Sequence, residues 1–181
     1  MIETERLVLH PLRQENILDV HELTSTEFIQ KYNMLQIQPL EQMHEDYKKE
    51  IANERSLYLE SKDSGRIIGN ISLERDYLRH GINCVCISYW LDENCTHKGY
   101  MREAMQAVID YCFVTLQVEL ISARVFQGND DSVKLLNYFG FVREGVLKHA
   151  IRKSETIVYD DQLFAYYRSG WEAMHQKAAA Q

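Results

Sequence analysis

The chain has 181 residues, of which 45% are hydrophobic and 26% charged, a balance that suits one folded domain and excludes an intrinsically disordered chain. Its formal net charge of −7 argues against a general binder of nucleic-acid backbones, which needs a broad excess of lysine and arginine, and agrees better with a cationic substrate. It has no run of about 18 apolar residues and no secretory signal pattern at its start, so we expect a cytoplasmic protein without a membrane span.

The N-terminal segment predicts a short strand followed by two helices. Leu7 and Leu9 alternate with polar neighbours and Pro11 ends the run, a pattern typical of a strand with one buried face. Strong helix formers then fill residues 15–25 and 39–53, and the second stretch carries a proline suited to a first helical turn.

The next segments predict a hairpin and a central strand. The turn cluster 62–65 separates two runs rich in aliphatic and aromatic residues, 57–59 and 67–71, so we expect a β-hairpin there. Residues 84–91 contain no charged side chain, as expected of a central strand that is covered on both faces.

A buried amphipathic helix should follow this strand, because its apolar side chains fall on one helical face: Met101, Ala104, Met105, Val108, Cys112 and Leu116. Residues 120–126 then predict a strand, and residues 131–139 a short helix that ends at Gly140. The result is a strand-helix-strand unit over residues 84–126.

The C-terminal segments predict a long antiparallel pair of strands, residues 141–152 and 156–167, before a final helical stretch at 171–176. We found no linker or repeat, so we expect one domain over residues 1–181, with 173–181 as a candidate disordered tail. The fold class is therefore α+β with a largely antiparallel sheet. The four cysteines form no CxxC pair and suit buried positions, so we expect neither a disulfide framework nor a metal site.

Residues 94–102, between the central strand and the amphipathic helix, have the chemistry of an anion site. Amides of a first helical turn lack internal partners and lie at the positive end of the helix dipole. Gly99 lets backbone approach a bulky anion, and Lys98 and Arg102 add positive charge. On these residues alone, an ordinary loop explains the pattern equally well.

A second polar segment, residues 129–132, precedes the short helix. Asn129, Asp131 and Ser132 are all favourable near a helix start, so in isolation a well-capped helix explains them.

Together these segments resemble the Gcn5-related N-acetyltransferase (GNAT) superfamily, and within it the ribosomal-protein alanine N-acetyltransferase (RimJ/RimL-like) branch. Six motifs occur in the family's order: Thr4-Glu5-Arg6-Leu7 with Leu9, Ser88-Tyr89-Trp90-Leu91, the run from His97 to Ala104, Asn129 with Ser132, Gly140-Phe141, and Glu144-Gly145. The resemblance implies an acyl-CoA N-acyltransferase fold, with about seven strands in a mixed sheet that is flanked by helices and splayed at a central parallel pair.

The resemblance also implies that acetyl-CoA binds as cosubstrate in this splay, with its pantetheine arm along the backbone near Trp90 and Leu91. Asn129 would bond the pantetheine or position the thioester, and Ser132 would donate a proton to the departing sulfur. The diphosphate would lie on the backbone amides of the turn formed by His97, Lys98, Gly99, Tyr100, Met101 and Arg102.

The chain departs from the family pattern at three positions. Thr96 replaces the first Arg or Gln of the diphosphate turn, and Met101 replaces its last small residue, so the long Met101 side chain must point away from the ligand. Leu136 stands where the family usually has its tyrosine acid, so Tyr138 does not simply inherit that role and Ser132 gains weight as the acid.

Direct transfer needs a neutral amine, a group that accepts the amine's proton, and stabilisation of the oxyanion. Candidate bases are Glu74, at the end of a predicted strand, and Tyr89, on the central strand. Ordinary structural roles for both stay open: a solvated carboxylate for Glu74 and a core aromatic for Tyr89. Two roles are open for Asp160 and Asp161, pairing with a substrate amine or pairing with Arg152 and Lys153, and we interpret them as paired surface charges.

Three functions follow as alternatives. The first is acetylation of the α-amine of a protein or peptide N-terminus; the second is acetylation of a small amine such as a polyamine, amino acid or aminoglycoside; the third is a non-catalytic acyl-CoA-binding module. We expect no direct contact with nucleic acid or membrane, and the resemblance implies a homodimer.

Overall fold

The computed structural model describes residues 1–50 and 55–179, and its backbone forms two compact units that interleave along the chain. Unit 1 consists of Met1–Leu73 and Tyr89–Ala107, and unit 2 consists of Glu74–Ser88 and Val108–Gln181. The chain passes from one unit to the other three times, after Leu73, after Ser88 and after Ala107.

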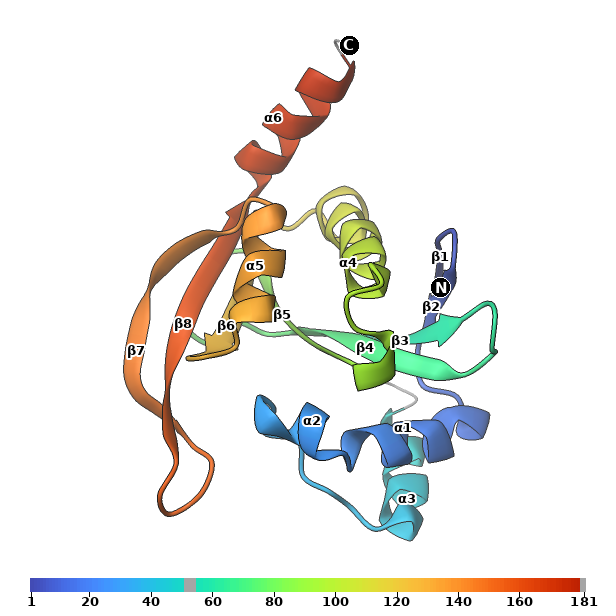
Figure 1. The fold of residues 1–181 in the computed structure, drawn as a ribbon. Coiled ribbons are helices and arrows are strands. Elements are labelled where there is room, and N and C mark those ends of the chain that lie inside the picture. The colour runs from blue at the N-terminus through green and yellow to red at the C-terminus, as the bar shows by residue number, and fades with distance from the viewer. Residues whose placement is uncertain (51–54, 180–181) are drawn as a thin grey trace. The chain divides into compact units, whose positions relative to one another are not determined.

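Unit 1 holds the N-terminal strands and three helices, whose course Figure 1 traces in blue and cyan. The helix predicted over 15–25 is confirmed, and the one predicted over 39–53 is described to Glu50, beyond which residues 51–54 lie outside the described part. The elements are β1 (Ile2–Glu3), β2 (Leu7–His10), a 3-10 turn (Gln14–Asn16), α1 (Ile17–Thr24), α2 (Glu27–Lys31), α3 (Leu40–Glu50), β3 (Ser56–Ser61) and β4 (Ile67–Glu74).

The strands of unit 1 pair in an antiparallel meander. Leu9 lies opposite Leu59, and Leu59 lies opposite Gly69, which confirms the first strand and the hairpin. The side chains of Leu7, Leu9 and Leu59 point into the core and are completely buried. The predicted alternation of Leu7 and Leu9 therefore marks the core face of the strand.

Unit 2 contains most of the remaining elements, and each predicted element is present. They are β5 (Cys84–Leu91), α4 (Tyr100–Asp110) with a π-helical turn (Tyr111–Thr115), β6 (Leu120–Phe126), α5 (Asp130–Tyr138), β7 (Val142–Arg152), β8 (Val158–Tyr167) and α6 (Arg168–Ala179). Strand β5 ends in unit 1, and α4 begins there.

The pairing confirms the expected mixed sheet. Strand β5 runs parallel to β6, with Cys84 opposite Leu120 and Ile87 opposite Ala123, while β8 pairs antiparallel with β6 and β7. Within the described residues, hydrogen-bonded neighbours follow the order β1-β2-β3-β4-β5-β6-β8-β7, eight strands where about seven were expected. The fold is the α+β class predicted, and β5 and β6 form its parallel pair.

Several details differ from the expectations. Strand β5 is only partly covered, since Ser88 is exposed, and Leu116 is 36% exposed because the π-helical turn ends the apolar face before it. Of the four cysteines expected in buried positions, only Cys112 is buried. Helix α6 continues directly from β8 (Figure 1), so residues expected as a tail are helical up to Ala179. None of the described helices combines the length and apolar character that crossing a membrane needs.

Candidate functional site

The turn before α4 lies in unit 1 and exposes backbone at a helix start. His97 and Gly99 both adopt the left-handed region, with φ of 57° and 83°. The Glu103 amide donates to the Gly99 carbonyl at 3.0 Å, so the amides of residues 100–102 precede this first bond of the helix. These amides lie at the positive end of the helix dipole, where an anion satisfies them.

The side chains of this turn leave the backbone accessible. His97, Lys98 and Arg102 are exposed, whereas Met101 is only 8% exposed and packs in the core. Thr96 donates from Oγ1 to the Glu93 carbonyl at 2.7 Å and so closes the preceding turn. Thr96 and Met101, the two departures from the family pattern within this turn, therefore both make contacts inside the protein.

A polar cluster braces this turn from the N-terminal strands. Glu103 Oε1 accepts hydrogen bonds from Thr4 Oγ1 at 2.6 Å and from the Arg6 amide at 2.7 Å, and its Oε2 accepts from Arg6 Nε at 2.6 Å. Burial alone would raise the pKa of Glu103, but the bonds from Thr4 and Arg6 outweigh it and hold the pKa below its usual value. We call Thr4, Arg6 and Glu103 the Glu103 brace.

The Arg6 guanidinium extends from this brace over the turn itself. Its Nη1 donates to the Lys98 carbonyl at 2.9 Å, and its Cζ lies 4.3 Å from the centre of the Tyr100 ring. The bond to Glu103 is the main cause that raises the pKa of Arg6. Sequence reasoning singled out both motifs but missed their connection, which only the folded chain reveals.

The end of β5, also in unit 1, packs closely on β4. Trp90 is 8% exposed and meets the Tyr58 ring edge-on at 6.4 Å between centroids, while Leu91 is half-buried. A Cβ added to Gly69 would lie 2.8 Å from the Trp90 carbonyl oxygen, so only glycine fits there. The backbone expected to lie beside the pantetheine is thus held rigidly on one side.

The two candidate bases differ in access. The Tyr89 hydroxyl, in unit 1, is buried, whereas Glu74, in unit 2, is exposed. Glu74 Oε1 accepts a hydrogen bond from Ser88 Oγ at 3.2 Å, which orients its carboxylate. In this conformation Glu74 is the more accessible proton acceptor.

Helix α5 of unit 2 begins at the predicted Asn129 cap. Asn129 Oδ1 accepts the Ser132 amide at 3.3 Å, and both residues are half-buried. Leu136, at the position of the family's tyrosine, is fully buried in the core, and Tyr138 is 58% exposed. Leu136 therefore offers no hydroxyl, and Ser132 remains the candidate acid that the family resemblance implies.

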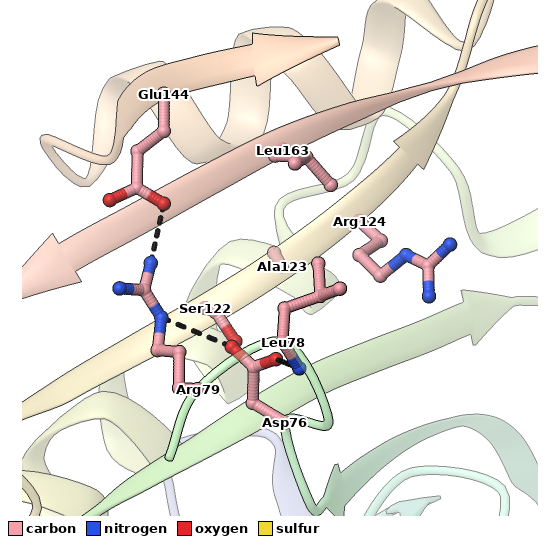
Figure 2. Close-up of a pocket in the computed structure, with 8 residues that line it drawn as sticks. All are labelled: Asp76, Leu78, Arg79, Ser122, Ala123, Arg124, Glu144 and Leu163. Atoms are coloured by element: carbon pink, nitrogen blue, oxygen red, sulfur yellow. Dashed lines mark hydrogen bonds and ion pairs between the residues drawn. The ribbon is translucent and has the colours of Figure 1, made fainter. Parts of the chain in front are cut away.

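Unit 2 also has a pocket of about 210 Å³, which Figure 2 shows between the loop after β4 and strands β6, β7 and β8. Its lining was not predicted, because it comes from four separate segments. The lining residues are Asp76, Leu78, Arg79, Ser122, Ala123, Arg124, Glu144 and Leu163.

Arg79 joins the two carboxylates of this pocket. It donates from Nε to Asp76 at 3.1 Å and from Nη2 to Glu144, as the dashed lines in Figure 2 show. The second oxygen of Asp76 accepts the Leu78 amide at 2.8 Å, and that of Glu144 accepts the Tyr167 hydroxyl at 2.5 Å. All four carboxylate oxygens are therefore already hydrogen-bonded.

Arg124, which lines the same pocket, is held by an ion pair with a buried carboxylate. Its Nε donates at 2.5 Å to Asp161, which is 1% exposed, and burial raises the pKa of this carboxyl despite the arginine. The interpretation of Asp161 as a surface charge was therefore wrong. Asp160 pairs with Lys148 at 2.7 Å rather than with the cations expected for it.

The comparisons with known proteins agree with this geometry. The family model described as "Acetyltransferase (GNAT) domain" matches residues 6–142. The uncharacterized N-acetyltransferase p20 of Bacillus licheniformis is 31% identical over 80% of this chain and 84% of its own length. The probable N-acetyltransferase YjcK of Bacillus subtilis is 34% identical over 48% of each chain, so the match spans about half of that relative.

Solved structures match nearly the whole chain. An acetyltransferase of the GNAT family from Bacillus anthracis has a TM-score of 0.81 at 23% identity and covers 93% of this chain and 98% of its own. Spermidine N-acetyltransferase from Vibrio cholerae, in complex with CoA and spermine, has a TM-score of 0.79 at 21% identity, covering 92% and 98%. Ribosomal-protein-S5-alanine acetyltransferase from Vibrio fischeri has a TM-score of 0.74 at 22% identity, covering 93% and 97%.

Proposed function

The chain belongs to the GNAT acetyltransferase family and is an acetyl-CoA-dependent N-acetyltransferase, and we propose that its acceptor is the α-amine of a protein or peptide N-terminus. This proposal assigns it to the RimJ/RimL-like branch. The choice of acceptor rests on the pocket in unit 2, where Arg79 donates hydrogen bonds to the carboxylates of both Asp76 and Glu144.

The cosubstrate fits the turn of unit 1. Its diphosphate binds the backbone amides between His97 and Arg102, with Lys98 and Arg102 supplying positive charge and Gly99 making room. The buried Met101 side chain supports this assignment, since it leaves the solvent side of the turn clear. Asn129 positions the thioester end, and the backbone of Trp90 and Leu91 accommodates the pantetheine.

Transfer proceeds by direct attack. The neutral amine forms the amide C–N bond as the thioester C–S bond breaks, and Glu74 accepts the amine's proton, directly or through water. Ser132 donates a proton to the departing thiolate and regains one from solvent, to which Glu74 releases its own. Tyr89 is the second candidate for the base, after Glu74, because its hydroxyl is buried.

An α-amine suits such a modest base. At pH 7 roughly a tenth of α-amino groups are neutral, against less than about a thousandth of lysine-like amines. A polyamine would also require carboxylates to hold its further charges, and the four carboxylate oxygens of Asp76 and Glu144 already have donors. The pocket instead offers the anchored guanidinium of Arg124, which suits peptide carbonyls or carboxylates.

The test is thiol release from acetyl-CoA with matched acceptors. We expect release with peptides that have a free N-terminus and none with the same peptides blocked at the N-terminus, even where they keep a lysine. Release with spermidine, an amino acid or an aminoglycoside but with no peptide would favour the small-amine alternative. Binding of CoA without release from any acceptor would favour the non-catalytic module. Sedimentation of the same sample tests the homodimer that the family resemblance implies.

A further inference from the structure

We propose that the Glu103 brace, formed by Thr4, Arg6 and Glu103, sets the geometry of the turn that binds acetyl-CoA, so that these are positioning residues for the cosubstrate. The proposal rests on the assignment of the diphosphate to the turn before α4. It adds a role for the N-terminal strands, which otherwise only build the sheet.

Glu103 is held both at its backbone and at its carboxylate. Its backbone amide donates to the Gly99 carbonyl at 3.0 Å, and its carboxylate accepts three hydrogen bonds of 2.6 to 2.7 Å from Thr4 and Arg6. The side chain is 17% exposed, so these bonds are partly shielded from water. The first turn of α4 is therefore fixed against the loop that joins β1 to β2.

Arg6 contacts Lys98 and Tyr100 and lies beside Gly99 between them. Its Nη1 bonds the Lys98 carbonyl, its Nη2 lies 3.3 Å from the position that a Cβ on Gly99 would take, and its Cζ stacks on Tyr100. Only a planar fork can bond Glu103 and the Lys98 carbonyl while it stacks on a ring, which a lysine cannot do.

The hydrogen bond from Arg6 to the Lys98 carbonyl also fixes the direction of the next backbone amide. In a trans peptide the C=O and the following N–H point in opposite directions. Because Arg6 holds the Lys98 carbonyl, the Gly99 N–H is turned away from Arg6 and kept in that orientation. The anion-binding backbone is thus preorganised, which lowers the cost of ordering it when the ligand binds.

The charge of Arg6 is not the main contribution. Glu103 lies 2.6 Å from it and compensates it, and the guanidinium is 40% exposed, so its long-range field is weak. Lys98 and Arg102 remain as the exposed cations of the turn. The brace is therefore expected to act through orientation rather than through electrostatic attraction.

The experiment measures CoA affinity by calorimetry, together with KM for acetyl-CoA and kcat, for Arg6→Lys, Arg6→Ala and Glu103→Gln. Arg66→Ala is the matched control, because Arg66 is an exposed arginine of the same unit that pairs with Asp19 and Glu22. We expect Kd and KM to rise about tenfold in all three brace variants, the equivalent of one lost charge-assisted hydrogen bond, with kcat nearly unchanged. The control should bind as the parent does.

Arg6→Lys is the decisive variant because it keeps the charge and loses the fork. If it binds CoA as tightly as the parent, or if melting temperature falls while Kd stays constant, the positioning role is wrong. Thr4→Val exchanges one hydroxyl for a methyl group and is used where another brace variant does not fold. Unchanged CoA affinity in Thr4→Val would likewise show that the positioning role is wrong. A parent protein that releases thiol but whose Gly99→Val variant binds CoA normally overturns the assignment of the turn itself, and with it this proposal.

Discussion

Asn129 accepts the backbone amide of Ser132 at 3.3 Å, so the cap of α5 uses the main chain of Ser132 and not its hydroxyl. The two residues can therefore be tested separately. A change that removes the Ser132 hydroxyl leaves the cap bond in place, whereas a change at Asn129 removes it.

Ser132→Ala should lower kcat about 100-fold or more with unchanged CoA affinity, because a general acid typically contributes about 10²–10⁴-fold. Melting temperature should stay constant, since the cap is retained. Ser169→Ala, at an exposed serine of α6, is the control. Turnover equal to the parent's would show that another group protonates the thiolate.

Asn129→Ala should destabilise the protein by about 1 kcal/mol, the usual cost of a lost helix cap. Asn129→Asp keeps an acceptor for the cap and should recover that stability, but it loses the amide donor and adds a negative charge beside the cosubstrate. We expect the aspartate variant to melt like the parent and to have a higher KM for acetyl-CoA. A KM equal to the parent's would limit Asn129 to capping.

Much of the fold follows from local patterns in the sequence. Strands β5 and β6 have the predicted bounds, because turn residues flank each apolar run. Helix α2 was missed, since its five residues are too few to show a period and its start depends on the Thr26 cap. Strand β1 has only two residues and exists through its pairing with β2, which no local pattern reveals.

The site was predictable only where its residues are neighbours in sequence. The diphosphate turn and the Asn129 cap are continuous segments, so their motifs could be read directly. Arg6 and Glu103 are 97 positions apart, and their contact depends on the packing of a strand end against a helix. The burial of Asp161 was missed for a similar reason, because its partner Arg124 lies on another strand.

Gly99→Val should weaken CoA binding about tenfold or more, because valine is strained at φ of 83° and the turn must move to relieve this strain. Gly65→Val is a matched control. Gly65 has φ of 66° in the hairpin between β3 and β4, and its added Cβ meets nothing within 4 Å. Both variants should lose stability, but only Gly99→Val should lose affinity in calorimetry. Equal affinity in the two would place the diphosphate elsewhere.

Acid should weaken the Glu103 brace in a defined direction. The folded pKa of Glu103 lies below its usual value of about 4.3, so the carboxylate stabilises the fold above that pH, and this stabilisation is lost as pH falls through the folded pKa. Glu103→Gln should therefore show a smaller drop in melting temperature than the parent between about pH 6, which is above the usual pKa of a glutamate, and about pH 3, which is below it. Glu15→Gln, at an exposed carboxylate, should follow the parent, and a Glu103→Gln curve parallel to the parent's would contradict the linkage.

Arg79→Ala should change acceptor preference, because it removes the cation that occupies Asp76 and Glu144 in the pocket of unit 2. The carboxylates then become available to a polycation, and we expect kcat/KM for spermidine to rise about tenfold relative to a peptide acceptor. Stability should fall by about 1 to 3 kcal/mol, since Asp76 is only 8% exposed and loses its partner. Arg143→Ala, at an exposed neighbour of Glu144 on β7, should alter neither quantity. A proportional loss of activity toward both acceptors would mean that Arg79 supports the fold and does not select the substrate.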